Sequence, residues 1–272
     1  MPFLERDNAS LHYELMPLEA GGRDVDLPWI TLINGHSRPG TDFRAMARHL
    51  AGRGLRVLAL DNRGSGKTAF TGSFRLDDLR NDVAALWDHL GIHGTHLLGV
   101  SMGGMIAMSL ALEMPDQVEG LILVSTAPSS TFLNQELRAP GGGSELDIHD
   151  SLLRYFSPEF ASKNPIFVKS LVKETAKSFL DPLGAEGARA QREAMADFDL
   201  TSELPNIEAP TLILHGSEDA IIPLAAGRAL AEGISTSHLE VFEGAGHLLL
   251  AETPRRLYER VAEFCGEANS RL

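Results

Sequence analysis

The chain has 272 residues, of which 43% are hydrophobic and 22% charged, and it contains no linker long enough to separate two halves. These values are typical of a soluble globular protein with one large core. The formal net charge of −13 argues against a nucleic-acid partner, which needs clustered Lys and Arg, and against binding to an anionic membrane surface.

The cysteine content and the first residues of the chain indicate in which cellular compartment the protein is expected. The single cysteine, Cys265, allows no intramolecular disulfide and suits a reducing environment. Residues 1–7 become charged before any long apolar run, so no signal peptide is predicted, and no apolar stretch approaches the ~20 residues of a membrane span. We therefore expect a cytoplasmic protein that does not contact a membrane and is either a monomer or a homodimer.

Short apolar runs alternate with longer amphipathic segments in the first half of the chain. Residues 3–15 predict a hairpin that turns at Asp7-Asn8, at the antiparallel edge of a sheet. The elements predicted next are a strand at 28–33, a helix at about 43–51, a strand at 55–60, a helix at 76–90 with Gly91 as its C-cap, a strand at 96–100, a helix from Ser101 to before Pro115, and a strand at 121–124.

The alternation stops between about Ala127 and Pro205 and then resumes. Helical patches at 148–156, 167–179 and 185–198, without strong strand runs, predict a helical cap inserted between two strands. The elements predicted after it are a strand at 211–214, a helix at about 224–232, a strand at 238–242 and a helix at about 254–264. The pattern predicts an α/β fold, a mostly parallel doubly wound sheet with helices on both faces. Its core would comprise residues 1–127 and 206–272, and its cap residues 128–205.

Residues 99–103, Gly-Val-Ser-Met-Gly, match the pattern G-x-S-x-G between a predicted strand and a predicted helix. A serine on such a tight strand-to-helix turn is strained and projects from the sheet, and flanking glycines leave room where a Cβ would clash. The N-terminal N–H groups of the new helix point to the same place and favour negative charge there. The alternative is a turn of small residues with an incidental serine, which the strand-and-helix context disfavours.

Residues 99–107 and 115–127 together resemble the α/β-hydrolase superfamily, and within it the branch of enol-lactonase-like enzymes and small carboxylesterases. The resemblance covers about residues 28–127 and 210–264 and leaves the cap as the divergent part. It implies a Ser–Asp–His catalytic triad in that chain order and a lid over the site. It also implies hydrolysis of an ester, lactone or related acyl bond of a small-molecule substrate, with no cofactor and no metal.

The resemblance places the catalytic nucleophile at Ser101 and the two other members of the triad near the C-terminus. Residues 214–223 resemble the family's strand and acid loop, in which Asp219 has the acid position and Glu218 is the adjacent competitor. A helix N-cap role for Asp219 is the structural alternative. Residues 244–247, Gly-Ala-Gly-His, resemble the family's histidine loop and make His247 the general base.

The oxyanion hole is expected to use two backbone N–H groups. One is that of Met102, directly after the nucleophile. The other lies in the loop after the 28–33 strand and is assigned to His36, with Ser37 as the alternative if the loop is shifted. The family usually has His-Gly where this chain has Asn34-Gly35, and whether the His36 side chain touches substrate stays open.

Two further patterns are discounted. Residues 63–68 have the Gly-Lys-Thr tail of a phosphate loop, but Asp61 stands where the first glycine is required, and the segment instead resembles the family's Asp-x-Arg-Gly-x-Gly turn. His89, His93 and His96 straddle a helix end and a buried strand, so they are not expected to converge on zinc.

The sequence thus predicts a serine hydrolase that acts on a small-to-medium apolar substrate through an acyl-enzyme. The alternatives are a carbon–carbon bond hydrolase or a perhydrolase on the same triad, and a small-molecule receptor on a hydrolase scaffold. The triplet Gly141–Gly143 suggests a mobile lid. Apolar cap residues form either a pocket roof or, for most of them, the cap's own core: Phe132, Leu133, Leu152, Tyr155, Phe156, Phe160, Phe167 and Phe179.

Overall fold

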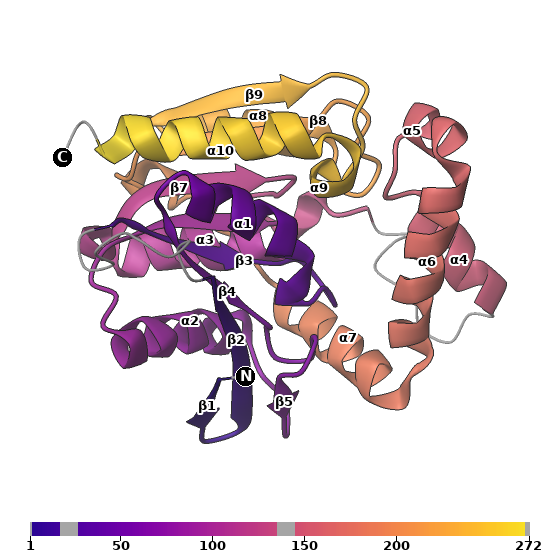
Figure 1. Ribbon diagram of the computed structural model, residues 1–272, viewed down its shortest axis with the longest axis horizontal. Coiled ribbons are helices and arrows are strands. Elements are labelled where there is room, and N and C mark those ends of the chain that lie inside the picture. The colour runs from indigo at the N-terminus through magenta and orange to yellow at the C-terminus, as the bar shows by residue number, and fades with distance from the viewer. Residues whose placement is uncertain (1, 17–26, 135–144, 270–272) are drawn as a thin grey trace.

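The computed structural model describes residues 2–16, 27–134 and 145–269 (Figure 1). Their strands form one sheet in the order β1-β2-β4-β3-β6-β7-β8-β9, with the short β5 beside β2. The strands are β1 Phe3–Arg6, β2 Ala9–Met16, β3 Trp29–Ile33, β4 Arg56–Leu60, β5 Ala69–Phe70, β6 Thr95–Val100, β7 Val118–Val124, β8 Thr211–Gly216 and β9 Ser237–Phe242. The sheet is parallel from β4 to β9, and β2 pairs antiparallel with β1, β4 and β5. The predicted mostly parallel sheet and its antiparallel hairpin edge are confirmed.

Helices cover both faces of this sheet, as the alternating pattern predicts. One face packs on α1 and α10, and the opposite face packs on α2, α3 and α8. These helices, with the short α9, are α1 Arg44–Gly52, α2 Leu76–Leu90, α3 Met102–Glu113, α8 Leu224–Gly233, α9 Leu249–Glu252 and α10 Pro254–Asn269. Helix α2 ends where predicted, because Gly91 adopts the left-handed conformation, with φ of 64°.

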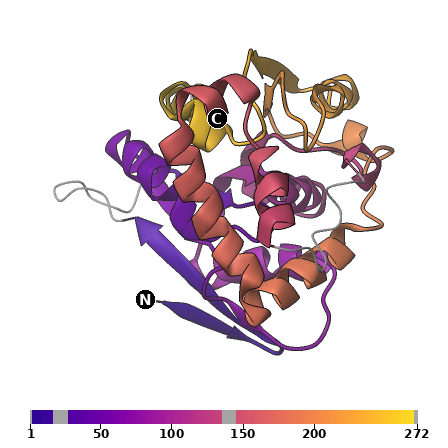
Figure 2. The same cartoon turned by 90° about the vertical axis from the view of Figure 1, so that its right-hand side faces the viewer.

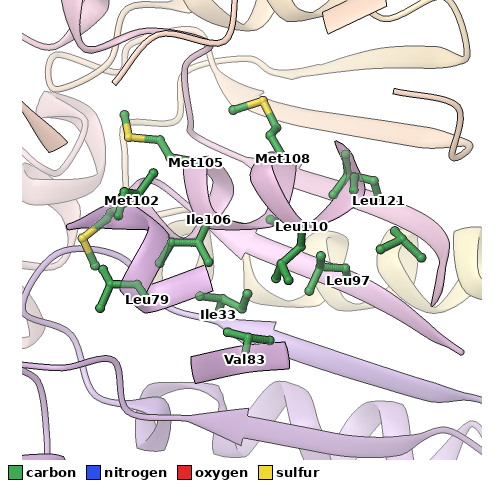
Figure 3. Packing of buried hydrophobic residues seen from close by; sticks show 14 of the residues in the cluster. Ile33, Leu79, Val83, Leu97, Met102, Met105, Ile106, Met108, Leu110 and Leu121 are labelled. Carbon is green, nitrogen blue, oxygen red and sulfur yellow. The ribbon is translucent and has the colours of Figure 1, made fainter. Parts of the chain in front are cut away.

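Helix α3 is the most deeply buried of these helices. Apolar side chains on it face both the sheet and helix α2 (Figure 3), so α3 is apolar on nearly all sides. From α3, this cluster includes Met102, Met105, Ile106 and Leu110. They pack with Leu79 and Val83 of α2 and with Ile33, Leu97 and Leu121 of the sheet. This packing fixes the start of α3, and therefore the residue directly before it, relative to the sheet.

In the described part of the chain, four α-helices between β7 and β8 lie beside the carboxyl ends of the strands (Figures 1 and 2). We call them the cap helices. They are α4 Glu145–Leu153, α5 Pro158–Lys163, α6 Pro165–Leu180 and α7 Pro182–Met195. A proline within the first turn starts α5, α6 and α7, where its missing N–H costs nothing. The triplet Gly141–Gly143, expected to be a hinge, lies outside the described residues.

Some short elements differ from the prediction. Helix α5, helix α9 and strand β5 are too short to leave a periodic pattern in the sequence, and the prediction misses them. The patch at 148–156 also ends earlier than expected, because Tyr155 and Phe156 lie in a turn after α4. Single-turn 3₁₀ helices occur at Gly40–Phe43, Pro115–Gln117, Ser130–Phe132 and Leu204–Asn206. Within the described ranges, no helix is long and apolar enough to cross a membrane.

Cys265 on α10 is buried, with 1% of its surface exposed, and burial raises the pKa of its thiol to about 12. Because the thiolate is the reactive form, the folded protein should react with iodoacetamide or a disulfide reagent at pH 8 about 10³-fold more slowly than the unfolded chain. The measurement is thiol labelling followed by mass spectrometry, with and without guanidinium. Rapid stoichiometric labelling of the folded protein would contradict this burial.

Candidate active site

Ser101 stands between the end of β6 and the start of α3, in a conformation that residues other than glycine rarely adopt. Its φ is 54° and its ψ is −118°. Glycines make the turn possible: a Cβ at Gly99 would lie 2.2 Å from the Gly103 carbonyl oxygen, and a Cβ at Gly103 would lie 2.1 Å from that of Ile33. The strain is held by packing and by the Thr126 hydroxyl, which donates to the Ser101 carbonyl at 2.7 Å. The result is a serine at the N-terminus of a helix.

A buried carboxylate and imidazole lie together beyond the ends of β8 and β9. His247 Nδ1 is 2.8 Å from Asp219 Oδ2, and both residues are less than 10% exposed. Oδ1 of Asp219 accepts the N–H groups of Ile221 and Ile222, each at 2.9 Å. Since a carboxylate only accepts, Nδ1 of His247 donates to it, which leaves Nε2 as the acceptor on this ring.

The loop that carries His247 is bonded to residues 155–157, which connect the cap helices α4 and α5. The N–H groups of His247 and Leu248 both donate to the Tyr155 carbonyl, and the Tyr155 ring packs edge-on against the imidazole at 5.4 Å. Burial, and then the charge of Asp219, raises the pKa of the Tyr155 hydroxyl. Glu252 completes the link by accepting the Gly246 N–H at 3.1 Å and the Ser157 hydroxyl at 2.7 Å. Cap and histidine loop are therefore held together.

The loop after β3 has its own internal support. The Asn34 side chain accepts the Gly35 N–H at 2.8 Å and donates to the Pro39 carbonyl at 2.8 Å. The asparagine that departs from the usual family pattern thus closes this loop. A Cβ at Gly35 would lie 3.2 Å from the Ser101 Cβ, so the loop passes directly against the serine. The Ser37 N–H is already bonded to Gln191 Oε1 at 2.7 Å.

His36 lies between this loop and the cap. Its Nε2 donates to the Ala188 carbonyl at 2.8 Å, and its ring stacks on Phe179 at 6.1 Å. Burial lowers the pKa of His36 to about 4, so the ring is neutral at pH 7.

A cavity of about 240 Å³ opens beside the serine. Ser101, His247 and His36 line it, while Asp219 lies behind His247 and Met102 begins α3. Of the eight apolar cap residues considered from the sequence, five line the cavity and three do not, so the expectation that most form only the cap's core is not met. The five are Leu152, Tyr155, Phe156, Phe167 and Phe179. Part of the wall is polar, because Arg38 and Asp42 also line the cavity; they pair with each other at 2.6 Å.

Sequence reasoning missed Arg38, Asp42, Gln191 and Glu252. The i, i+4 spacing of Arg38 and Asp42 is a weak signal for their pair. Gln191 lies in the amphipathic α7 and Glu252 at the end of the short α9, and neither local pattern gives a sign of the partner.

The segment that resembles a phosphate loop has a structural role, and the three histidines lie in different environments. Asp61 accepts the Gly40 and Lys67 N–H groups at 2.6 and 2.8 Å, and Arg63 forms a two-bond pair with Asp82. His89 and His93 are exposed, whereas His96 is buried in β6. In the described part of the chain, no three His, Cys, Asp or Glu side chains are placed to hold a metal.

Comparisons with known proteins agree with this architecture. The model of the alpha/beta hydrolase fold family matches residues 28–254. The chain is 32% identical to 3-oxoadipate enol-lactonase 2 of Acinetobacter baylyi over 73% of this chain and 74% of that protein. It is 31% identical to the AB hydrolase superfamily protein YisY of Bacillus subtilis, over 82% and 85%.

Among solved structures, the enol-lactonase of Burkholderia xenovorans superposes with a TM-score of 0.83 and 25% identity, covering 97% of this chain and all of that one. The sheet order, the serine turn and the match of the family model all lead to one assignment. The chain belongs to the alpha/beta hydrolase fold family and is a hydrolase of that fold.

Proposed function

We propose that the protein is a serine hydrolase that cleaves an ester, lactone or related acyl bond of a small-to-medium apolar substrate through an acyl-enzyme. The observation that carries this proposal is the strained Ser101 at the head of α3, in one cavity with His247, whose Nδ1 is held by Asp219. That arrangement supplies a nucleophile, a general base and the carboxylate that orients the base.

In the first half of the reaction, His247 Nε2 takes the Ser101 proton while Oγ bonds to the substrate carbonyl carbon. The carbonyl electrons move to oxygen, and the tetrahedral intermediate then expels the alkoxide, which receives the proton from His247. In the second half, His247 deprotonates a water that attacks the acyl-Ser101 carbonyl, and the acid leaves with Ser101 restored.

The oxyanion formed in each half would be held by the N–H groups of Met102 and His36. The Met102 N–H is the first of α3, so it has no acceptor within the helix and lies at the positive end of the helix dipole. The Ser37 N–H, the alternative second donor, is occupied by Gln191. This occupancy favours His36.

The substrate class is supported by the cavity lining. The apolar side chains of the cap and of the histidine loop would take the acyl or ring portion: Leu152, Phe156, Phe167, Leu171, Val172, Phe179, Leu248 and Leu250. A volume of about 240 Å³ is small for a ligand pocket, which favours short over long acyl chains. The enol-lactonases among the relatives make a lactone ring a second candidate shape.

The test combines a covalent probe with a substrate panel. A fluorophosphonate should label the protein once, at Ser101, and p-nitrophenyl butyrate should be hydrolysed faster than the octanoate, with lactones assayed alongside by acid release. Labelling without turnover of any ester or lactone would move the assignment to carbon–carbon bond hydrolysis or to a receptor. Failure to label the folded protein would refute the nucleophile itself.

A further inference from the structure

The loop that would carry the oxyanion donor is bonded to the cap helices at three consecutive residues. His36 Nε2 donates to the Ala188 carbonyl of α7, the Ser37 N–H donates to Gln191 of α7, and Arg38 Nη1 donates to Thr175 of α6. Their donor–acceptor distances lie between 2.6 and 2.8 Å. The loop is therefore fixed from the cap side as well as from the sheet side.

Gln191 is the fully buried member of this set, with 0% of its surface exposed. Its Oε1 accepts the Ser37 N–H at 2.7 Å, while its Nε2 donates to the Arg63 carbonyl at 2.6 Å and to the Ser65 hydroxyl at 2.9 Å. The backbone partners fix which way the amide points, because an N–H needs an acceptor and a carbonyl needs a donor. One side chain thus joins α7, the 36–38 loop and the 63–65 turn.

The backbone is strained at Ser37 and packed very closely beside the 63–65 turn. Ser37 has a φ of 59°, in the left-handed region that costs energy for a residue with a Cβ. Gly64 meets Gly187 of α7 so closely that a Cβ on Gly64 would lie 2.7 Å from the Gly187 Cα. That contact sets the separation between α7 and the turn, across which the Gln191 amide bonds to Arg63 and Ser65.

We infer that Gln191 is a positioning residue for the oxyanion hole, acting through Ser37 to hold the His36 N–H toward the Ser101 reaction centre. The inference rests on the proposed function for its catalytic consequence. Gln191 does not line the cavity, so it acts on the loop and not on the substrate. Because the held group stabilises charge that exists only in the transition state, its displacement lowers kcat more than it alters KM.

The test compares Gln191→Met, which keeps side-chain length and loses the amide, with Ser65→Ala, which removes a partner of Nε2 but leaves the bond to Ser37. With p-nitrophenyl butyrate, Gln191→Met should lower kcat about 10- to 100-fold, since displacing a group by ~1 Å can cost ~10²-fold and complete loss of an oxyanion donor costs ~10²–10³-fold. KM should stay within about twofold. Ser65→Ala should stay within about threefold of wild type for both constants.

A transition-state analogue separates positioning from a general loss of folding. Butylboronic acid forms a tetrahedral adduct on a serine, so its affinity should fall in Gln191→Met by the same factor as kcat/KM. Gln191→Asn, whose amide is one methylene too short to reach both loops, serves as the second variant if Gln191→Met does not fold. A fall in kcat without a fall in butylboronic acid affinity, or an equal loss in Ser65→Ala, would overturn the inference.

Hydrogen exchange tests the loop-positioning role of Gln191 independently of the proposed hydrolase activity. The Ser37 amide should exchange at least tenfold faster in Gln191→Met than in wild type, whether or not an ester is turned over. In Ser65→Ala its exchange rate should be unchanged. If wild type hydrolyses no ester while this difference is present, the proposed function fails and the loop-positioning role of Gln191 stands. Equal protection of Ser37 in wild type and Gln191→Met would overturn that role.

Discussion

Ser101→Ala is expected to lower kcat for p-nitrophenyl butyrate by about 10⁴- to 10⁶-fold, with the fluorophosphonate reaction lost completely. The reason is that alanine removes the atom that forms the acyl-enzyme, so His247 has no hydroxyl to deprotonate. What remains is the stabilisation supplied by the oxyanion donors and by substrate binding, which acts on attack by water alone. The measurement is steady-state hydrolysis at enzyme concentrations high enough to exceed the background rate.

Ser125→Ala is the matched control for this substitution. Ser125 also follows a parallel strand, β7, and also has a positive φ, of 48°, but it is fully buried and does not line the cavity. Its replacement should leave kcat and probe labelling within about twofold of wild type. If Ser101→Ala retained more than a tenth of wild-type activity while Ser125→Ala lost it, the nucleophile would have been assigned to the wrong strand end.

Much of the fold could be predicted because buried parallel strands and amphipathic helices leave strong local patterns. Strands β3, β4, β6, β7 and β8 appear as apolar runs, since neighbouring strands and helices cover both their faces. The serine turn is equally local, because Gly99 and Gly103 are each required by a backbone that approaches within 2.2 Å of where their Cβ atoms would lie.

The part of the site that escaped prediction is made of contacts between distant segments. Gln191 meets Ser37 across 154 positions of the chain, and Glu252 meets Ser157 across 95. Nothing in the local pattern of α7 distinguishes a glutamine on its buried face from one on its surface, because amphipathicity encodes which face is covered and not what covers it. Tyr155 likewise lies in a turn, and its carbonyl accepts from the histidine loop, a contact that the local sequence pattern does not indicate.

The same limit applies to the acid of the proposed triad, for which the sequence offered two adjacent carboxylates, Glu218 and Asp219. Glu218 is exposed, whereas Asp219 is 6% exposed and its Oδ2 lies 2.8 Å from His247 Nδ1. A carboxylate at that position does two things at once: it fixes the backbone through Ile221 and Ile222, and it orients the imidazole. A mutation that separates the two effects tests the role of the charge directly.

Asp219→Asn makes that separation and is expected to lower kcat by about 10⁴-fold at neutral pH. The Asn Oδ1 can still accept the N–H groups of Ile221 and Ile222, so the loop is retained. The Asn Nδ2 now donates to His247 Nδ1, which puts the ring proton on Nε2 and removes the acceptor that Ser101 needs. Steady-state ester hydrolysis measures the loss, and Glu218→Gln, which removes the adjacent exposed charge, should stay within about twofold of wild type. Because the two substitutions each remove one negative charge one residue apart, equal losses would show a general electrostatic effect, and a loss in Glu218→Gln alone would transfer the acid role to Glu218.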